Sequence, residues 1–85
     1  MNSVMFSQLR SLAFDHGFLV FERNDEKFHL FDRNHHSNVF STDDLEQLVV
    51  EIELNTDEKS AELIAWLDRF WKQAFAKTKA GATND

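Results

Sequence analysis

The sequence contains no cysteine and no proline, and only two of its 85 residues are glycine. The lack of cysteine excludes a disulfide framework and any zinc or redox site that depends on thiolate ligands. The scarcity of proline and glycine argues against a disordered or linker-rich chain. No apolar run approaches the roughly 20 residues of a membrane-spanning helix, and the N-terminus lacks a basic-then-apolar signal pattern. These absences predict a soluble protein, which we expect in the cytoplasm.

The length limits how the chain can be stabilised. Eighty-five residues are enough for one domain, and we expect a compact unit over residues 1–80 with a frayed tail at 81–85. A chain of this size buries only about 60–65% of its unfolded surface. Nine phenylalanines and two tryptophans make the expected core unusually aromatic. Small domains often add self-association to internal packing, so a homodimer is one expectation.

Charge is distributed unevenly along the chain. The formal net charge is −6, which disfavours direct binding to nucleic acid because such binding requires a basic surface. Residues 43–62 contain eight acids and one base, so they carry −7 and leave +1 for the rest of the chain. The acids are Asp43, Asp44, Glu46, Glu51, Glu53, Asp57, Glu58 and Glu62. Acids in the first turn of a helix stabilise its dipole, but this does not account for Glu51 and Glu53.

The strongest local signal predicts a helix from about Asp57 to Thr78, with Asn55 as its N-cap and Glu58 completing a capping box. Its apolar side chains form an arc of roughly 180°, where a helix that covers a core needs little more than about 100°. The arc contains Leu63, Ile64, Trp66, Leu67, Phe70, Trp71, Ala74 and Phe75. Such a helix either packs on two neighbours or leaves Trp66 or Trp71 partly exposed as a contact surface. We favour packing, because a small domain needs nearly all its aromatic area inside.

A helix and a β-hairpin are predicted in the first third of the chain. The helix runs from Ser3 to about Asp15 and is stopped by Gly17. The hairpin has strands at 18–23 and 26–32 and a two-residue turn at Asn24-Asp25. An even-numbered turn collects a wholly apolar set on one face, which we expect the last helix to cover. That set is Leu19, Phe21, Phe28 and Leu30.

The other hairpin face contains Phe18, Val20, His29 and Phe31. His29 is expected either at the edge of a half-covered sheet or in a pH-sensitive interface, since histidine titrates near neutrality. The sequence does not decide whether a helix covers this face.

The segment after the hairpin has two interpretations. Val39-Phe40 predicts a short third strand, and Ser41 is expected to cap a helix, with Asp44 in the capping-box position. However, apolar residues alternate with glutamates up to Leu54, which is typical of a strand. We favour the helix because its start signals are strong. The predicted fold class is α+β, with a small antiparallel hairpin or three-stranded sheet packed against helices in the order α-β-β-(β)-α-α.

Few residues have the spacing that catalysis or metal binding requires. The chain has no Gly-x-Ser-x-Gly elbow and no glycine-rich phosphate loop, and we assign no catalytic residue. His29, Asp32, His35 and His36 form the one cluster that resembles metal ligands. Their spacing gives neither an i,i+4 helical pair nor an alternating pair. We therefore assign no metal site and no cofactor.

By elimination, the sequence predicts a non-catalytic protein–protein interaction module or small regulator that uses an aromatic helix face and an acidic face. The candidate partner-binding residues are Trp66, Trp71, Phe70, Glu51, Glu53, Asp43, Asp44 and Glu46. One alternative is an acidic inhibitor that mimics nucleic acid and occupies a groove on a basic partner. The other is a small metal-binding or enzymatic domain built on the histidine cluster.

Overall fold

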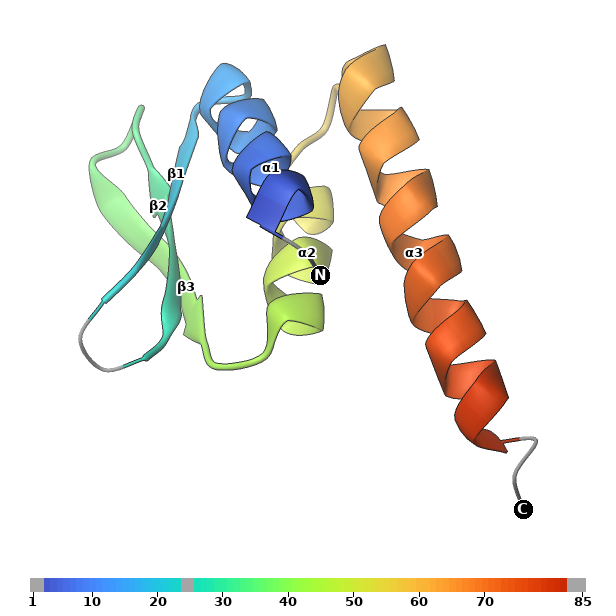
Figure 1. Cartoon of the computed structure of the whole chain (residues 1–85). Coiled ribbons are helices and arrows are strands. Elements are labelled where there is room, and N and C mark those ends of the chain that lie inside the picture. The colour runs from blue at the N-terminus through green and yellow to red at the C-terminus, as the bar shows by residue number, and fades with distance from the viewer. Residues whose placement is uncertain (1–2, 24–25, 83–85) are drawn as a thin grey trace.

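The computed structural model describes residues 3–23 and 26–82, with side chains up to Ala76. The chain forms one helix, then three strands, and then two further helices (Figure 1). The elements are α1 (Ser3–Asp15), β1 (Phe18–Glu22), β2 (Phe28–Asp32), β3 (Ser37–Thr42), α2 (Leu45–Leu54) and α3 (Ala61–Ala82). The strands form one antiparallel sheet in the order β1-β2-β3. This confirms the predicted α+β fold class, with the third strand present. Among the described helices, none has the length and apolarity needed to cross a membrane.

α1 has the predicted bounds. Its buried residues are Met5, Leu9 and Ala13, which lie four apart and therefore on one face. Gly17 has a φ of 92°, in the left-handed region that glycine adopts without a steric penalty. A Cβ at this position would lie 3.0 Å from Nδ2 of Asn34. Both the backbone conformation and the available space therefore favour glycine where the chain turns from α1 into β1.

The hairpin register differs by one residue from the predicted one. Phe21 lies opposite His29, whereas the predicted even loop would pair Phe21 with Phe28. A shift of one residue exchanges the two faces of a strand. The prediction was wrong because residues 18–21 are all apolar, so either register offers an apolar face to the core. The loop therefore sets the register.

The hairpin loop has three residues rather than two. The amide of Arg23 donates to the carbonyl of Lys27 at 3.2 Å, and the amide of Glu26 donates to the carbonyl of Arg23 at 2.9 Å. Glu26 has a φ of 62°, as expected for the residue that ends a three-residue hairpin loop in the left-handed conformation. The predicted turn residues 24 and 25 lie outside the described residues.

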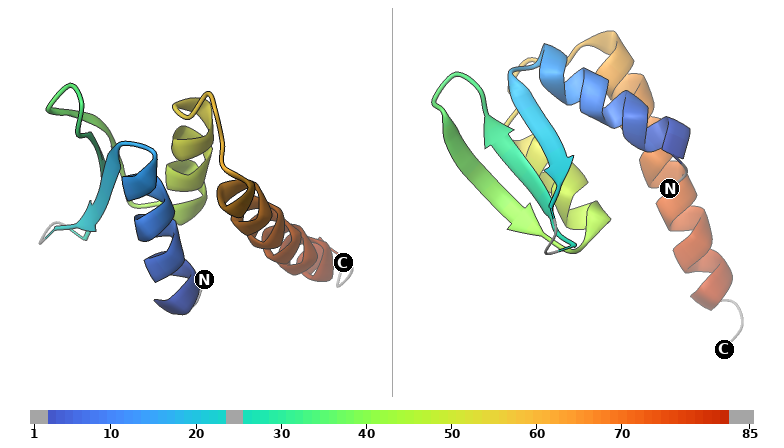
Figure 2. Two further views of the ribbon diagram at one scale, coloured as in Figure 1. Left: turned by 90° about the horizontal axis from the view of Figure 1, so that it is seen from above. Right: turned by 60° about the vertical axis from the view of Figure 1, so that its left-hand side comes forward.

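The core face of the sheet carries Phe18, Val20 and Leu30, all buried. The opposite face carries Leu19, Phe21, His29 and Phe31, which the register places together. In both views of Figure 2 the helices lie on one side of the sheet, and no helix of the described chain covers the other side. On this open face the His29 ring is 8% exposed, stacks on Phe21 with 5.4 Å between ring centroids, and lies 2.7 Å from the Ser41 hydroxyl.

The helices form two layers beside the sheet. α1 packs on β1, α2 packs on β2 and β3, and α3 packs on α1 (Figure 1). The prediction that the last helix covers the sheet was wrong, because α1 and α2 occupy that face. The core lies between the sheet and the three helices. Its largest fully buried side chains are Trp66, Leu9, Leu30, Leu48, Ile52, Leu63 and Val49.

Side-chain hydrogen bonds join α3 to both ends of α1. At the C-terminal end of α1, Nε2 of His16 accepts from the amide of Ser60 at 3.1 Å. This nitrogen must be unprotonated, so Nδ1 carries the hydrogen and donates to the carbonyl of Leu12 at 2.7 Å. At the other end, Nε1 of Trp66 donates to the carbonyl of Met5 at 3.0 Å. These bonds fix α3 against α1 rather than against the sheet.

The start of α2 differs in detail from the prediction. The segment is helical, as expected, but its N-cap is Asp44, whose carboxylate accepts from the amide of Glu46 at 2.9 Å. The predicted cap, Ser41, belongs to β3. Three apolar residues of α2, Leu48, Val49 and Ile52, are buried. Their spacing of one, three and four residues places them on one helical face, and this packing prevails over the strand-like alternation.

α3 begins four residues later than predicted, at Ala61. Its first turn is capped by Ser60, whose hydroxyl accepts from the amide of Leu63 at 3.2 Å. Asn55, the predicted N-cap, instead ends α2, where its side-chain amide donates to the carbonyl of Glu51 at 2.8 Å. α3 continues to Ala82, inside the segment 81–85 expected to fray, and residues 83–85 lie outside the described residues.

Candidate functional site

The aromatic arc of α3 divides into a buried part and an exposed part. Trp66 is fully buried and Phe70 is 6% exposed. Their rings stack with 5.2 Å between centroids and 11° between planes. These two candidate partner-binding residues therefore pack inside the fold. The exposed members of the arc are Ile64 and Phe75, with Trp71 half-buried between them in sequence.

Trp71 connects α3 to α2. Its indole nitrogen donates to Oε1 of Glu53 at 2.5 Å. Its ring meets the Phe70 ring edge-on, with 4.9 Å between centroids, and lies 6.4 Å from that of Phe75. The hydrogen bond and the ring contacts hold the indole in one orientation, with part of its surface open to solvent.

A hollow of about 490 Å³ lies between α2 and α3. We call it the α2–α3 groove, and its lining residues are Val50, Glu53, Leu54, Trp71 and Phe75. Leu54 and Phe75 are each 70% exposed and Val50 is 40% exposed. Isolated apolar side chains on a surface are ordinary, but a contiguous set on facing elements is typical of a contact site. The lining is apolar except for Glu53, whose carboxylate is bound to the indole of Trp71.

The acidic residues of α2 divide between local bonds and open surface. Asp44 caps the helix, Glu53 accepts from Trp71, and Glu51 accepts from the side chain of Asn55 at 3.3 Å. Asp43 and Glu46 are exposed. Three of the five predicted acidic contacts, Asp44, Glu51 and Glu53, thus have partners within the chain, and the other two lie towards the N-terminal end of α2.

The histidine cluster does not converge. His35 lies 2.8 Å from Oδ2 of Asp32, whereas His29 is on the open face of the sheet beside Ser41. The amides of Asn34 and His35 both donate to Oδ1 of Asp32. The hydrogen bond from the His35 side chain is the main cause that lowers the pKa of Asp32 below its ordinary value. This carboxylate organises the turn between β2 and β3. Within residues 3–23 and 26–82, no three His, Asp or Glu side chains meet as metal ligands.

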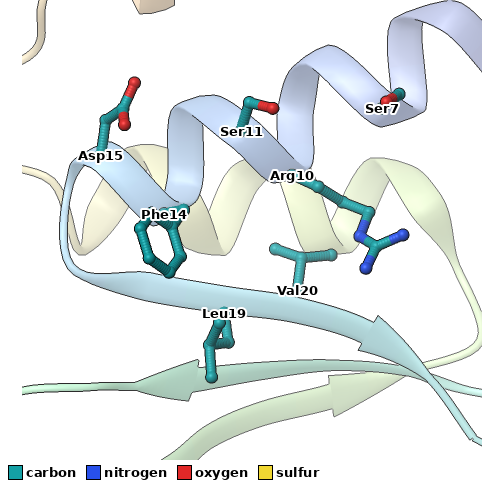
Figure 3. Close-up of a pocket in the computed structure, with 7 residues that line it drawn as sticks. All are labelled: Ser7, Arg10, Ser11, Phe14, Asp15, Leu19 and Val20. Carbon is teal, nitrogen blue, oxygen red and sulfur yellow. The ribbon is translucent and has the colours of Figure 1, made fainter.

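A second hollow, of about 360 Å³, lies between α1 and β1 (Figure 3). Its lining residues are Ser7, Arg10, Ser11, Phe14, Asp15, Leu19 and Val20. A serine nucleophile requires an adjacent base, and among the described lining residues there is no histidine. The Phe14 ring is covered by Arg33, whose guanidinium carbon lies 3.9 Å from the ring centroid. This hollow has the features of a surface depression rather than a reaction site.

The sequence pattern predicted only some of the residues that line the groove. Phe75 belongs to the predicted aromatic arc, but neither Phe75 nor Val50 nor Leu54 is among the predicted contact residues. The helical positions of Val50 and Leu54 fall beside the buried stripe of α2 rather than in it, which marks them as exposed apolar residues once the helix is accepted.

No family model, curated protein or solved structure matches this chain. The candidate site is therefore defined by its geometry and chemistry.

Proposed function

We propose that this protein is a cytoplasmic, non-catalytic protein–protein interaction module that works without a cofactor, and that its contact surface is the α2–α3 groove. The observation that supports this most directly is the pair Leu54 and Phe75, which are each 70% exposed and line the same groove as Trp71. Exposed apolar side chains around a held tryptophan have the composition of an interface centre, where a few aromatic anchors carry most of the binding energy.

The acidic face supplies the margin of this surface. Asp43 and Glu46 are exposed, so a partner with basic residues would be attracted and oriented as it approaches. The nucleic-acid-mimicking alternative requires these carboxylates to act alone as the contact. It is less well supported, because Asp44, Glu51 and Glu53 are engaged in local hydrogen bonds.

The proposal is tested by isolating a partner with the wild-type chain and then measuring its affinity for groove variants. Leu54→Ser and Phe75→Ser each remove an exposed apolar side chain, and we expect each to weaken binding by about tenfold or more. Ile64→Ser is the matched control, because Ile64 is 55% exposed on the same helix but does not line the groove.

Circular dichroism melting of each variant verifies that the fold is intact. Binding that is unchanged by both groove variants would exclude the groove as the contact surface. Binding that survives these variants but disappears at high salt, and on charge reversal of Glu51 and Glu53, would instead favour the acidic inhibitor.

A further inference from the structure

The second half of α3 extends beyond the rest of the molecule (Figures 1 and 2). The radius of gyration is 13.6 Å and the longest dimension is 46 Å, whereas a compact chain of this length has a radius of about 12 Å. Trp71 is half-buried, and Phe75, one turn further on, is 70% exposed. An isolated helical segment shorter than about 12–15 residues is only marginally stable in water. The extended half of α3 would therefore gain stability from a contact that the single chain does not provide.

The two helices that form the groove carry opposite charge. Residues 43–54 contain five acids and no base. The part of α3 from residue 69 to residue 82 contains Arg69, Lys72, Lys77 and Lys79 and no acid. On α2, Glu46, Val50 and Leu54 lie four residues apart, so the exposed acid and the apolar side of the groove share one face. A segment that fits this face should combine a large apolar side chain with basic residues, and the second half of α3 has this composition.

We propose that the occupant of the α2–α3 groove is the second half of α3 from a second copy of this chain. Two such helices lie antiparallel across a two-fold axis, and Phe75 of each copy enters the groove of the other. The basic half of each α3 then runs along the acidic face of its partner's α2. Because a two-fold contact uses the same surface on both copies, one association fills two grooves and neutralises two acidic faces.

This inference rests on the proposed function, since it names the partner for the same surface. The second half of α3 in another copy supplies both a large apolar side chain and basic residues, so the chain itself contains everything that the groove requires of a partner. In this dimer the acidic segment of one copy lies against the basic segment of the other, although each chain has a net charge of −6.

The test is sedimentation equilibrium of the full chain from about 1 µM to about 1 mM. For the wild type we expect the weight-average mass to rise from 10.0 kDa towards twice that value. Phe75→Ser should weaken the dimer by tenfold or more. Ile64→Ser should leave it unchanged, because Ile64 lies three turns before Phe75, outside the half of α3 that enters the second copy.

A charge exchange provides an independent measurement. The double variants Asp43→Lys/Glu46→Lys and Lys77→Glu/Lys79→Glu should each dimerise several-fold more weakly than the wild type. A 1:1 mixture of the two should form a heterodimer of restored affinity, because one of its contacts has the wild-type charge pairing and the other has the same pairing with both signs reversed. Native mass spectrometry distinguishes the heterodimer from either homodimer by mass.

The outcomes separate the two proposals. A wild-type chain that stays monomeric, but whose groove variants lose another protein partner, overturns the second-copy proposal and retains the interaction module. A dimer that Phe75→Ser does not weaken also overturns it, because another surface is then responsible. A monomer with no partner that depends on the groove contradicts both.

Discussion

The two tryptophans of α3 are five residues apart but have different surroundings. Trp66 is fully buried and bonded to the carbonyl of Met5, whereas Trp71 is half-buried and bonded to Glu53. Because Trp66 is buried, it contributes to the stability of the fold rather than to a contact surface. The partial exposure of the second leaves it available to a partner. The sequence assigned both to one contact surface because both fall within the same apolar arc.

We predict that Trp66→Phe lowers the free energy of unfolding by about 2–3 kcal/mol, because it removes a buried hydrogen bond and leaves a cavity. Trp71→Phe should cost only about 1 kcal/mol, since the side chain is partly exposed and its hydrogen bond to Glu53 is only partly buried. Urea unfolding followed by far-ultraviolet circular dichroism measures both. Equal losses for the two variants would contradict the division of the arc into a buried and an exposed part.

Asp32 gives a pH-dependent prediction at the scale of one residue. Its pKa is lowered from 3.8 chiefly by the hydrogen bond with the His35 side chain. A lowered folded-state pKa means that the ionised carboxylate stabilises the fold above the unfolded-state value, and that this stabilisation is lost as the pH falls through the lowered pKa. At neutral pH the contribution is therefore fully present.

We expect Asp32→Asn to unfold at a lower urea concentration than the wild type at pH 7. The difference between the two midpoints should shrink as the pH falls below about 4. His35→Ala, which removes the principal hydrogen bond, should reduce the pH dependence of the wild-type midpoint. A difference between wild type and Asp32→Asn that stays constant at acidic pH would show that the charge of Asp32 is not the cause.

At the scale of the element, the loop between β1 and β2 determines which side chains enter the core. Glu26 has a φ of 62°, a conformation that costs a residue with a Cβ roughly 1–2 kcal/mol and that glycine adopts freely. The three-residue loop sets the register that places Phe18 and Val20 on the core face, where both are buried. Local strain at Glu26 is thus offset by packing.

Replacing Glu26 tests this relation. Glu26→Gly should leave stability unchanged or raise it by up to about 1 kcal/mol, since the relief of strain is partly offset by the greater freedom of the unfolded chain. Glu26→Val should lower it by about 1–2 kcal/mol, because a β-branched side chain is poorly tolerated at positive φ. Denaturant midpoints of both variants measure the difference. Glu26→Val as stable as Glu26→Gly would show that the backbone at this position is not strained.

Element boundaries show where local sequence is sufficient and where it is not. α1 was predictable from end to end, because its apolar stripe and Gly17 are both local signals. The start of α3 was not, because Asn55 is an equally good N-cap and C-cap residue until the end of α2 is known. Ser60 prevails as the cap of α3 because the end of α1 fixes its amide through His16. That contact joins residues 44 positions apart and has no local signal.

At the scale of the whole molecule, the layering depends on pairings that no single segment encodes. Fold class and element order could be predicted from periodicity and caps. The covering of the sheet by α1 and α2 could not, because all three helices have an apolar face that fits a sheet. The groove has the same origin: Val50 and Leu54 become a site only where α2 lies beside Trp71 and Phe75. The aromatic and acidic residue types around the groove could be predicted from the sequence, but their arrangement could not.

The proposed dimer also makes a thermodynamic prediction for the whole molecule. Association that occurs only in the folded state adds stability in proportion to the logarithm of concentration, so the melting temperature of the wild type should rise with protein concentration. For a domain of this size, the rise is about 4–8 °C for each kcal/mol added. Part of the association energy comes from opposite charges on α2 and α3, so the rise should be smaller at 1 M salt than at low salt.

Full-length Phe75→Ser is the matched comparison for this melting experiment. Phe75 is 70% exposed, so its removal should change the stability of the single chain little, and the two proteins should melt together at about 1 µM, where both are monomeric. At about 1 mM the wild type should melt several degrees higher, while the rise for the variant should be clearly smaller because its dimer is at least tenfold weaker. Parallel concentration dependence in the two proteins would mean that self-association uses another surface. A melting temperature independent of concentration in both would leave the groove to a different partner.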